Sequence, residues 1–169
     1  MSFLASIDEV AEYIGISSNE NPSFLRSLIS SCSGMVESIC CRSFQLKETM
    51  EIRTGDGTNK LVLYGFPIVE VKSIVIDDEE QDLTEFDIIK EDGVLIWNEG
   101  DFPTTDNSIR VQYIFGYKEI PKEVSLAVKM LVKWFYANTQ RRGEEEVVPT
   151  ELRMELSDML EPYKNLKVY

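Results

Sequence analysis

Four consecutive acidic residues, Asp77, Asp78, Glu79 and Glu80, form the densest group of side chains capable of chemistry in this sequence. Carboxylates that converge from different elements can bind divalent cations or act as acid and base. These four instead follow one β-type segment, IVEVKSIVID, and precede another, which is where a hairpin turn belongs. Consecutive acids on a turn mostly point into water and repel one another. We therefore predict a solvated hairpin tip.

Asp56 is the other acidic candidate, in the sequence GDGTN. Glycine and aspartate tolerate the positive φ of a tight turn, and the segment lacks the glycine spacing and following helix of a phosphate-binding loop. The chain has no histidine, which removes the commonest general base and zinc ligand. We predict no catalytic residue, no metal site and no cofactor. A carboxylate-based, metal-dependent hydrolase using Asp56, Asp77 or Asp78 stays open as an alternative.

The three cysteines, Cys32, Cys40 and Cys41, fit a reducing compartment. Their number is odd, two of them are adjacent, and no zinc-binding spacing is present. The first residues, MSFLASIDEV, lack the pattern of a signal peptide, and no apolar run approaches the ~20 residues that span a membrane. We expect a chain without membrane contact, used in a cytosol or in a particle assembled there.

The net charge of −13 opposes binding to free nucleic acid, because phosphate binding needs clustered lysine and arginine. Solubility alone would explain such a charge. Two narrower explanations stay open: an acidic surface can face a basic protein partner, or it can line a passage that DNA traverses without adhering.

The hydrophobic pattern predicts an α+β fold, a helical bundle with an inserted antiparallel β module. Ser6 and Glu9 form a capping box at the start of the first helix, and Asn21 with Pro22 starts the second. Five or six short strands are expected, with Asp92-Gly93 at a second hairpin turn. The predicted helices cover residues 6–16, 22–41, 121–143 and 150–163, and the predicted domain segments are 1–44, 45–117, 118–143 and 144–169.

Two helices have patterns that bear on assembly. The second places small polar residues such as Ser33 opposite its apolar face, and the third is apolar except for a narrow stripe that includes Ser125. Trp134 and Phe135 are adjacent on this third helix and project about 100° apart. The last helix follows the charged segment EEEVVP and either folds back on its own subunit or packs elsewhere. The predicted interface residues are Leu152, Leu156, Met159, Leu160, Tyr163 and Trp134.

The order of these segments resembles the head–tail connector (adaptor) proteins of tailed bacteriophages and prophages. The resemblance covers nearly the whole chain, and its most specific parts are GDGTNKLVLYGFPIVEVKSIVIDD and IRVQYIFGYKEIPKEVSLAVKMLVKWFY. It implies a structural virion protein without catalytic residues. Such a subunit would form a homo-oligomeric ring under the portal protein, twelvefold in that family, and extend the DNA channel. It would also provide the docking platform for tail or stopper (head-completion) proteins.

The resemblance places the protein at the head–tail interface of a virion assembled in the cytoplasm of a bacterial host. DNA would pass through the ring without specific binding. Another tail-completion or assembly protein of a phage remains the nearest alternative. The apolar surface of the third helix agrees with an assembling subunit, because it exceeds what two short N-terminal helices can cover.

Overall fold

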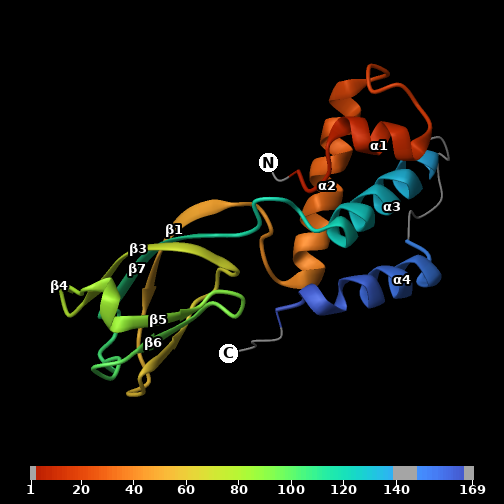
Figure 1. The fold of residues 1–169 in the computed structure, drawn as a ribbon. Helices are drawn as coiled ribbons and strands as arrows, with labels where there is room; N and C mark the ends of the chain where they lie inside the picture. Colours follow the sequence, from red (N-terminus) through yellow and green to blue (C-terminus); the bar gives the residue numbers. More distant parts are fainter. Residues whose placement is uncertain (1–2, 139–147, 166–169) are drawn as a thin grey trace. The chain divides into compact units, whose positions relative to one another are not determined.

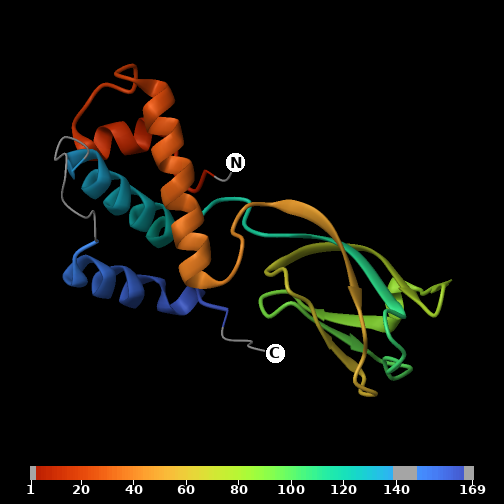
Figure 2. The same cartoon turned by 180° about the vertical axis from the view of Figure 1, so that it is seen from behind.

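The computed structural model describes residues 3–138 and 148–165 of the chain. The chain divides into two compact units. The helical unit consists of residues 1–44 and 119–169, and the β unit consists of residues 45–118. The predicted α+β fold, with an antiparallel β module between helices, is confirmed (Figures 1 and 2). The finer division into four domain segments stays a prediction.

The first two helices begin where their sequences predict. Helix α1 spans Ile7–Ile14, and the capping box between Ser6 and Glu9 is present. Helix α2 spans Pro22–Cys40, but the side chain of Asn21 makes no capping hydrogen bond. The backbone φ of Asn21 is 56°, whereas a capping residue usually has an extended backbone. Asn21 therefore occupies the predicted N-cap position, and the helix starts at Pro22 as predicted, but the expected capping hydrogen bond is missing.

Ser33 on α2 is fully buried, which corrects its predicted place on a polar face. Its hydroxyl accepts a hydrogen bond from the backbone N–H of Leu4, at 3.1 Å. This bond ties the N-terminal segment to α2. A serine can lie in an apolar core when its oxygen has a partner, and the partner here is 29 residues away in sequence.

Helix α3, Lys122–Asn138, is the centre of the helical unit and contacts α1, α2 and α4 (Figure 1). Ser125, predicted to lie in an exposed stripe, is buried. Trp134 and Phe135 are both half-buried, and their rings meet edge to face with centroids 4.8 Å apart. Adjacent residues thus pack on each other, although their Cα–Cβ bonds diverge. The predicted end of this helix, 139–143, lies outside the described residues.

Helix α4, Thr150–Leu160, continues into the 3₁₀ turn η2, Glu161–Tyr163. Figure 2 shows α4 (blue) beside the lower part of α2 (orange), and α4 contacts both α2 and α3. Most of the charged segment predicted before it, residues 144–147, lies outside the described residues. No described helix combines the length and the apolar character needed to cross a membrane.

The β unit is a sandwich of two antiparallel sheets. The first has the strand order β1–β7–β3–β4, and the second has the order β2–β6–β5. A 3₁₀ turn, η1 (Leu83–Glu85), precedes β5. Seven strands form where five or six were predicted. The strands are β1 Lys47–Arg53, β2 Lys60–Val62, β3 Ile68–Ile76, β4 Glu79–Glu80, β5 Phe86–Ile89, β6 Val94–Trp97 and β7 Ile109–Phe115.

Strand β7 is central in the first sheet and supplies the middle of the core. Its burial alternates without exception, as period-two patterning predicts. The aromatic rings of Phe86, Trp97 and Phe102 close one side of the same core, with centroid separations of 5.6 to 6.1 Å. The inward residues of β7 are Ile109, Val111, Tyr113 and Phe115, all predicted to share a face.

Hydrogen bonds at the buried Tyr113 connect β7 with β1 and with the loop between β2 and β3. Its hydroxyl donates a hydrogen bond to Glu51 on β1 and accepts one from the backbone N–H of Gly65, at 2.9 Å. Burial, followed by the hydrogen bond to Glu51, raises the pKa of Tyr113 well above its usual value. A Cβ at Gly65 would lie 2.5 Å from the Phe115 ring, so this close approach requires glycine. The residue next to Gly65 forms a cis peptide bond, Phe66-Pro67.

Candidate interface surfaces

The acidic run forms a hairpin tip, as the sequence predicted. Asp77 and Asp78 are the two turn residues, with φ of 50° and 68°, the positive values that a tight type I′ turn requires. Glu79 and Glu80 form β4, and they pair with Ile76 and Val75 at the end of β3. All four acids are exposed. Asp78 forms an ion pair with Arg110, so the carboxylates do not converge on a common centre.

Asp56 stabilises its own turn. Its carboxylate accepts hydrogen bonds from the backbone N–H of Thr58 at 2.9 Å and from the Thr58 hydroxyl at 2.6 Å. These bonds, the hydroxyl first, lower the pKa of Asp56. Within the described residues, no group of three or more histidine, cysteine, aspartate or glutamate side chains is arranged to hold a metal ion.

The cysteine thiols of α2 are not poised for nucleophilic chemistry. Burial raises the pKa of Cys32 to about 12 and that of Cys40 to about 11, which keeps both thiols protonated near neutral pH. Cys41 is exposed, and its thiol donates to the carbonyl of Ser38. A reactive cysteine needs a stabilised thiolate, and burial opposes one at Cys32 and Cys40.

The predicted interface stripe on α4 faces mostly into the helical unit. Leu156 and Leu160 are fully buried there. Tyr163 packs edge to face on Phe44, with centroids 6.1 Å apart, and donates a hydrogen bond to Glu123 at 2.8 Å. The remaining predicted interface residues, Leu152, Met159 and Trp134, are half-buried. An interface role for the six residues stays a prediction, and in this arrangement Leu156 and Leu160 have no surface to offer a partner.

A groove of about 760 Å³ lies between α2 and α4, which the sequence did not reveal. Leu131 and Leu156 contribute apolar lining. Met35 and Ile39 also line it and are 42% and 39% exposed. A Cβ at Gly34 would meet nothing within 4 Å, so no contact inside the subunit requires glycine there. Its lining is more apolar than that of the recess between the N-terminal segment and α3.

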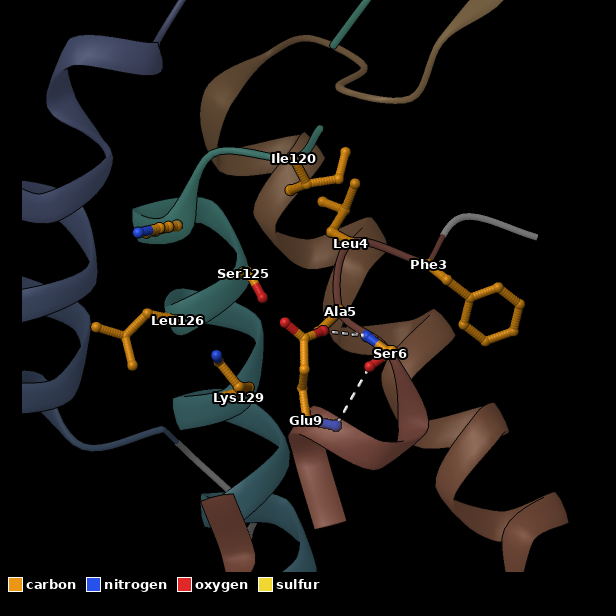
Figure 3. A pocket seen from close by; sticks show the side chains of 10 residues that line it. Phe3, Leu4, Ala5, Ser6, Glu9, Ile120, Ser125, Leu126 and Lys129 are labelled. Carbon is orange, nitrogen blue, oxygen red and sulfur yellow. Dashed lines mark hydrogen bonds between the residues drawn. The ribbon is translucent and has the colours of Figure 1, made fainter. Parts of the chain in front are cut away.

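A second recess of about 750 Å³ lies between the N-terminal segment and the start of α3 (Figure 3). Glu9 occupies its wall, and its carboxylate accepts a hydrogen bond from the backbone N–H of Ser6 at 2.8 Å. This bond, with a smaller contribution from Lys129, lowers the pKa of Glu9. The Ser125 hydroxyl points toward the recess, and no hydrogen-bond partner for it exists among the described residues.

The β unit exposes apolar side chains along β1. Met50 and Ile52 are 58% and 56% exposed, although the strand is part of a well-paired sheet. Sequence reasoning missed this surface because LKETMEIRT alternates only roughly. The sequence does contain the relevant pattern, because Met50 and Ile52 are separated by one glutamate and therefore share a face of the strand.

Exposed apolar surfaces of this kind mark places where a folded subunit can contact other macromolecules. Comparisons with known proteins identify the class. The family model described as "Head completion protein" matches residues 3–146. The chain therefore belongs to the head completion protein family, and its role is structural, in head completion and head–tail connection in the virion. The predicted resemblance is confirmed.

Two solved structures share the fold over nearly the full length of the chain. One is from the neck of an empty gene transfer agent (GTA) particle computed with C6 symmetry. It has a TM-score of 0.73 and 11% identity, over 98% of this chain and 92% of that one. The other is from the virion of a native GTA particle, with a TM-score of 0.67 and 14% identity, over 100% of this chain and 95% of that one. No curated protein matches the chain.

Proposed function

We propose that this chain is a non-enzymatic connector subunit that assembles into a ring beneath the portal of a phage-like particle. In this role the ring extends the channel for DNA and presents a platform for a tail or stopper protein. Assembly takes place in the cytoplasm of the bacterial host. The observation that carries the proposal is the family match over residues 3–146, together with a fold shared over 92% of a chain from the neck of a GTA particle.

The surface of the chain supports a role in assembly. Exposed large apolar side chains occur in both units, among them Met35 and Ile39 beside the α2–α4 groove and Met50 and Ile52 on β1. Exposed apolar patches on a folded subunit mark interaction surfaces. A closed ring of identical subunits needs two different, complementary surfaces on each copy. The groove between α2 and α4 is a candidate for one of these two surfaces.

The charge supports passage of DNA without adhesion. With a net charge of −13, the chain repels phosphate groups, and it lacks the clustered basic residues of a nucleic-acid-binding protein. A non-enzymatic role agrees with the positions of the three aspartates considered for catalysis. Asp56 accepts hydrogen bonds within its own turn, and Asp77 and Asp78 are the residues of a hairpin turn.

The proposal is tested by native mass spectrometry of the purified chain, alone and mixed with portal rings. We expect a complex that contains one closed ring of this chain for each portal. A chain that binds a tail tube and not the portal would favour the alternative of a tail-completion protein. Addition of Mg²⁺, Mn²⁺ or Ca²⁺ should leave the melting temperature unchanged, because a specific metal site would stabilise the folded state.

A further inference from the structure

Strand β1 is an open edge of the first sheet. It pairs with β7 over its whole length, from Lys47 opposite Phe115 to Arg53 opposite Ile109, without a register shift. No described strand pairs with its other side. An edge of this kind presents a row of backbone N–H and C=O groups, which can pair with another extended chain.

The other sheet edges of the β unit are shorter or charged. Strand β4 has only the two residues Glu79 and Glu80, β2 has three residues, and β5 has four, including the exposed Asp87. Proteins protect edge strands by making them short, by adding charges or proline, or by introducing bulges. Strand β1 also has charged residues, Lys47, Glu48, Glu51 and Arg53, but it is the longest of these edges, with seven residues, no proline and no bulge. It is therefore the edge of this unit best suited to accept a further strand.

The inward-facing charge on β1 does not block pairing. Glu51 points toward the core, and an unsatisfied inward charge would oppose association along the edge. Its carboxylate instead accepts hydrogen bonds from the backbone N–H of Tyr64, at 3.1 Å, and from the Tyr113 hydroxyl. Glu51 is thus occupied within its own subunit and leaves the outer side of β1 available.

The outward side chains of β1 provide two apolar contacts. Met50 and Ile52 lie opposite Gln112 and Arg110 of β7. The charged groups around them have partners, because Glu48 pairs with Lys72 at 2.9 Å and Arg110 pairs with Asp78. Met50 and Ile52 are two residues apart, so both lie on the same face of β1, and Glu51 between them lies on the other face. Apolar side chains at alternate positions of an added strand could pack against this pair.

The charge of the β unit determines the chemistry of the occupant. Residues 45–118 contain 16 acidic and 7 basic side chains, a net charge of −9 out of −13 for the whole chain. Strand β1 itself is balanced, with Lys47 and Arg53 against Glu48 and Glu51, so the acidic excess lies on the rest of the unit. A second copy of this unit would bring the same excess, which disfavours its approach. A basic segment would be attracted, because complementary charge steers association and disfavours partners of like charge.

We propose that β1 accepts an extended segment of another protein, which adds one strand to the first sheet. The segment has apolar side chains at alternate positions, seated against Met50 and Ile52, and a net positive charge. The inference deepens the proposed function and rests on it in one respect, namely that the chain is built into a particle beside other proteins. The main-chain hydrogen bonds hold the added strand, and the apolar pair fixes its register.

The first experiment uses two short blocked peptides, one of alternating lysine and valine and one of alternating glutamate and valine, with the full-length chain. Binding is followed by fluorescence anisotropy, and its position by backbone amide shifts in NMR spectra. We expect the lysine peptide to bind and to shift the amides of residues 47–53, with much weaker binding of the glutamate peptide. Absence of binding, or shifts confined to the acidic tip at 77–80, would overturn the proposal.

A matched pair of variants tests the apolar contacts. Met50→Thr combined with Ile52→Thr places threonine, which favours strands, at both positions and should weaken binding of the lysine peptide about tenfold or more. The control is Ile89→Thr on β5, which removes the same kind of apolar group from a side chain that is 44% exposed. Equal losses in both variants would contradict a specific role of β1. Single substitutions at Met50 or Ile52 serve if the double variant unfolds.

Hydrogen–deuterium exchange in assembled particles separates this inference from the proposed function. If the chain is present in the neck and its β1 amides exchange more slowly than in the free subunit, the inference is supported. If the chain is present and β1 exchanges equally in both states, the inference fails while the proposed function stands. If the chain is absent from the particles, the proposed function fails. If the β1 amides of the free chain exchange more slowly as the chain concentration rises, a second copy of the chain pairs with β1. That result would overturn the proposal.

Discussion

The helical unit is assembled from two stretches of chain that are far apart in sequence, whereas the β unit is one continuous stretch, residues 45–118. The helical unit closes only when α3 and α4 return to α1 and α2. Each unit has its own buried residues, so the inserted unit can vary without changing the helical core. In the proposed arrangement, the helical unit forms the ring and the β unit provides an additional docking surface.

The two units also differ in how they use polar groups. In the β unit, the Tyr113 hydroxyl makes hydrogen bonds to Glu51 and to the Gly65 N–H. In the helical unit, the buried Ser33 hydroxyl makes a single hydrogen bond, to the Leu4 N–H. Buried polar groups specify one arrangement because each must keep its partner. The β unit therefore depends more on a few exact positions, and the helical unit more on apolar volume.

The chain contains one tryptophan in each unit, which makes the comparison measurable. Trp97 packs against Phe86 and Phe102 in the β unit, and Trp134 packs against Phe135 in the helical unit. A Trp134→Phe background lets fluorescence report urea unfolding of the β unit, and a Trp97→Phe background lets it report the helical unit. Each prediction below is measured in the background that reports its unit.

The largest expected effect is Gly116→Ala in the β unit. Gly116 has a φ of 106°, and an added Cβ would lie 2.3 Å from the backbone oxygen of Gln45. We expect a loss of about 4 kcal/mol in unfolding free energy, from strain and overpacking together. Stability of the helical unit, read from Trp134, should change much less. Equal loss in both units would show that they unfold as one and break the comparison.

Leu160→Ala tests the closure of the helical unit by α4. The side chain is fully buried, so its truncation should cost about 3 kcal/mol. Met154→Ala on the same helix is the control, since Met154 is 62% exposed and its loss should cost less than about 0.5 kcal/mol. A small loss of stability in Leu160→Ala, together with loss of portal binding, would indicate that α4 belongs to the interface predicted from the sequence.

Tyr113→Phe tests the hydrogen bonds at Tyr113 in the β unit. Removal of the hydroxyl leaves Glu51 and the Gly65 N–H with one partner fewer, which should cost about 1–2 kcal/mol. The pKa of Tyr113 is raised in the folded state, so its contribution to stability is present below the unfolded pKa of about 10 and is lost as pH rises above it. Urea unfolding is measured at increasing alkaline pH, and the unfolding free energy of the β unit should fall more in the wild type than in the variant.

The smallest expected effect is a gain of stability from Gly34→Ala. Glycine inside a helix costs about 0.5–1 kcal/mol relative to alanine, and nothing within the subunit lies within 4 Å of the added Cβ. The variant should therefore be more stable by that amount. If a helix of another subunit packs closely against Gly34, the added methyl group should impair ring formation on the portal. A stabilised variant with unchanged assembly would exclude the groove at Gly34 as a close helix-packing surface.

The sequence by itself determined the local features of this protein. The capping box of α1, the start of α2 at Pro22, the turn at Asp77-Asp78 and the alternation along β7 each depend on residues close together in the chain. Side-chain period and turn chemistry act over a few residues, so one sequence is enough to detect them. The resemblance to the connector family depended on the order of such features.

Only the tertiary structure decided which surfaces are closed and which are open. Ser33 is buried because Leu4, 29 residues away, supplies its partner, and Leu160 is buried because α4 returns to the helical core. The open edge at β1 exists because β7 is the one strand among the described residues that pairs with it. Such outcomes depend on which distant segments meet, and the period of a single segment is the same whether its outer face meets water, its own subunit or a partner.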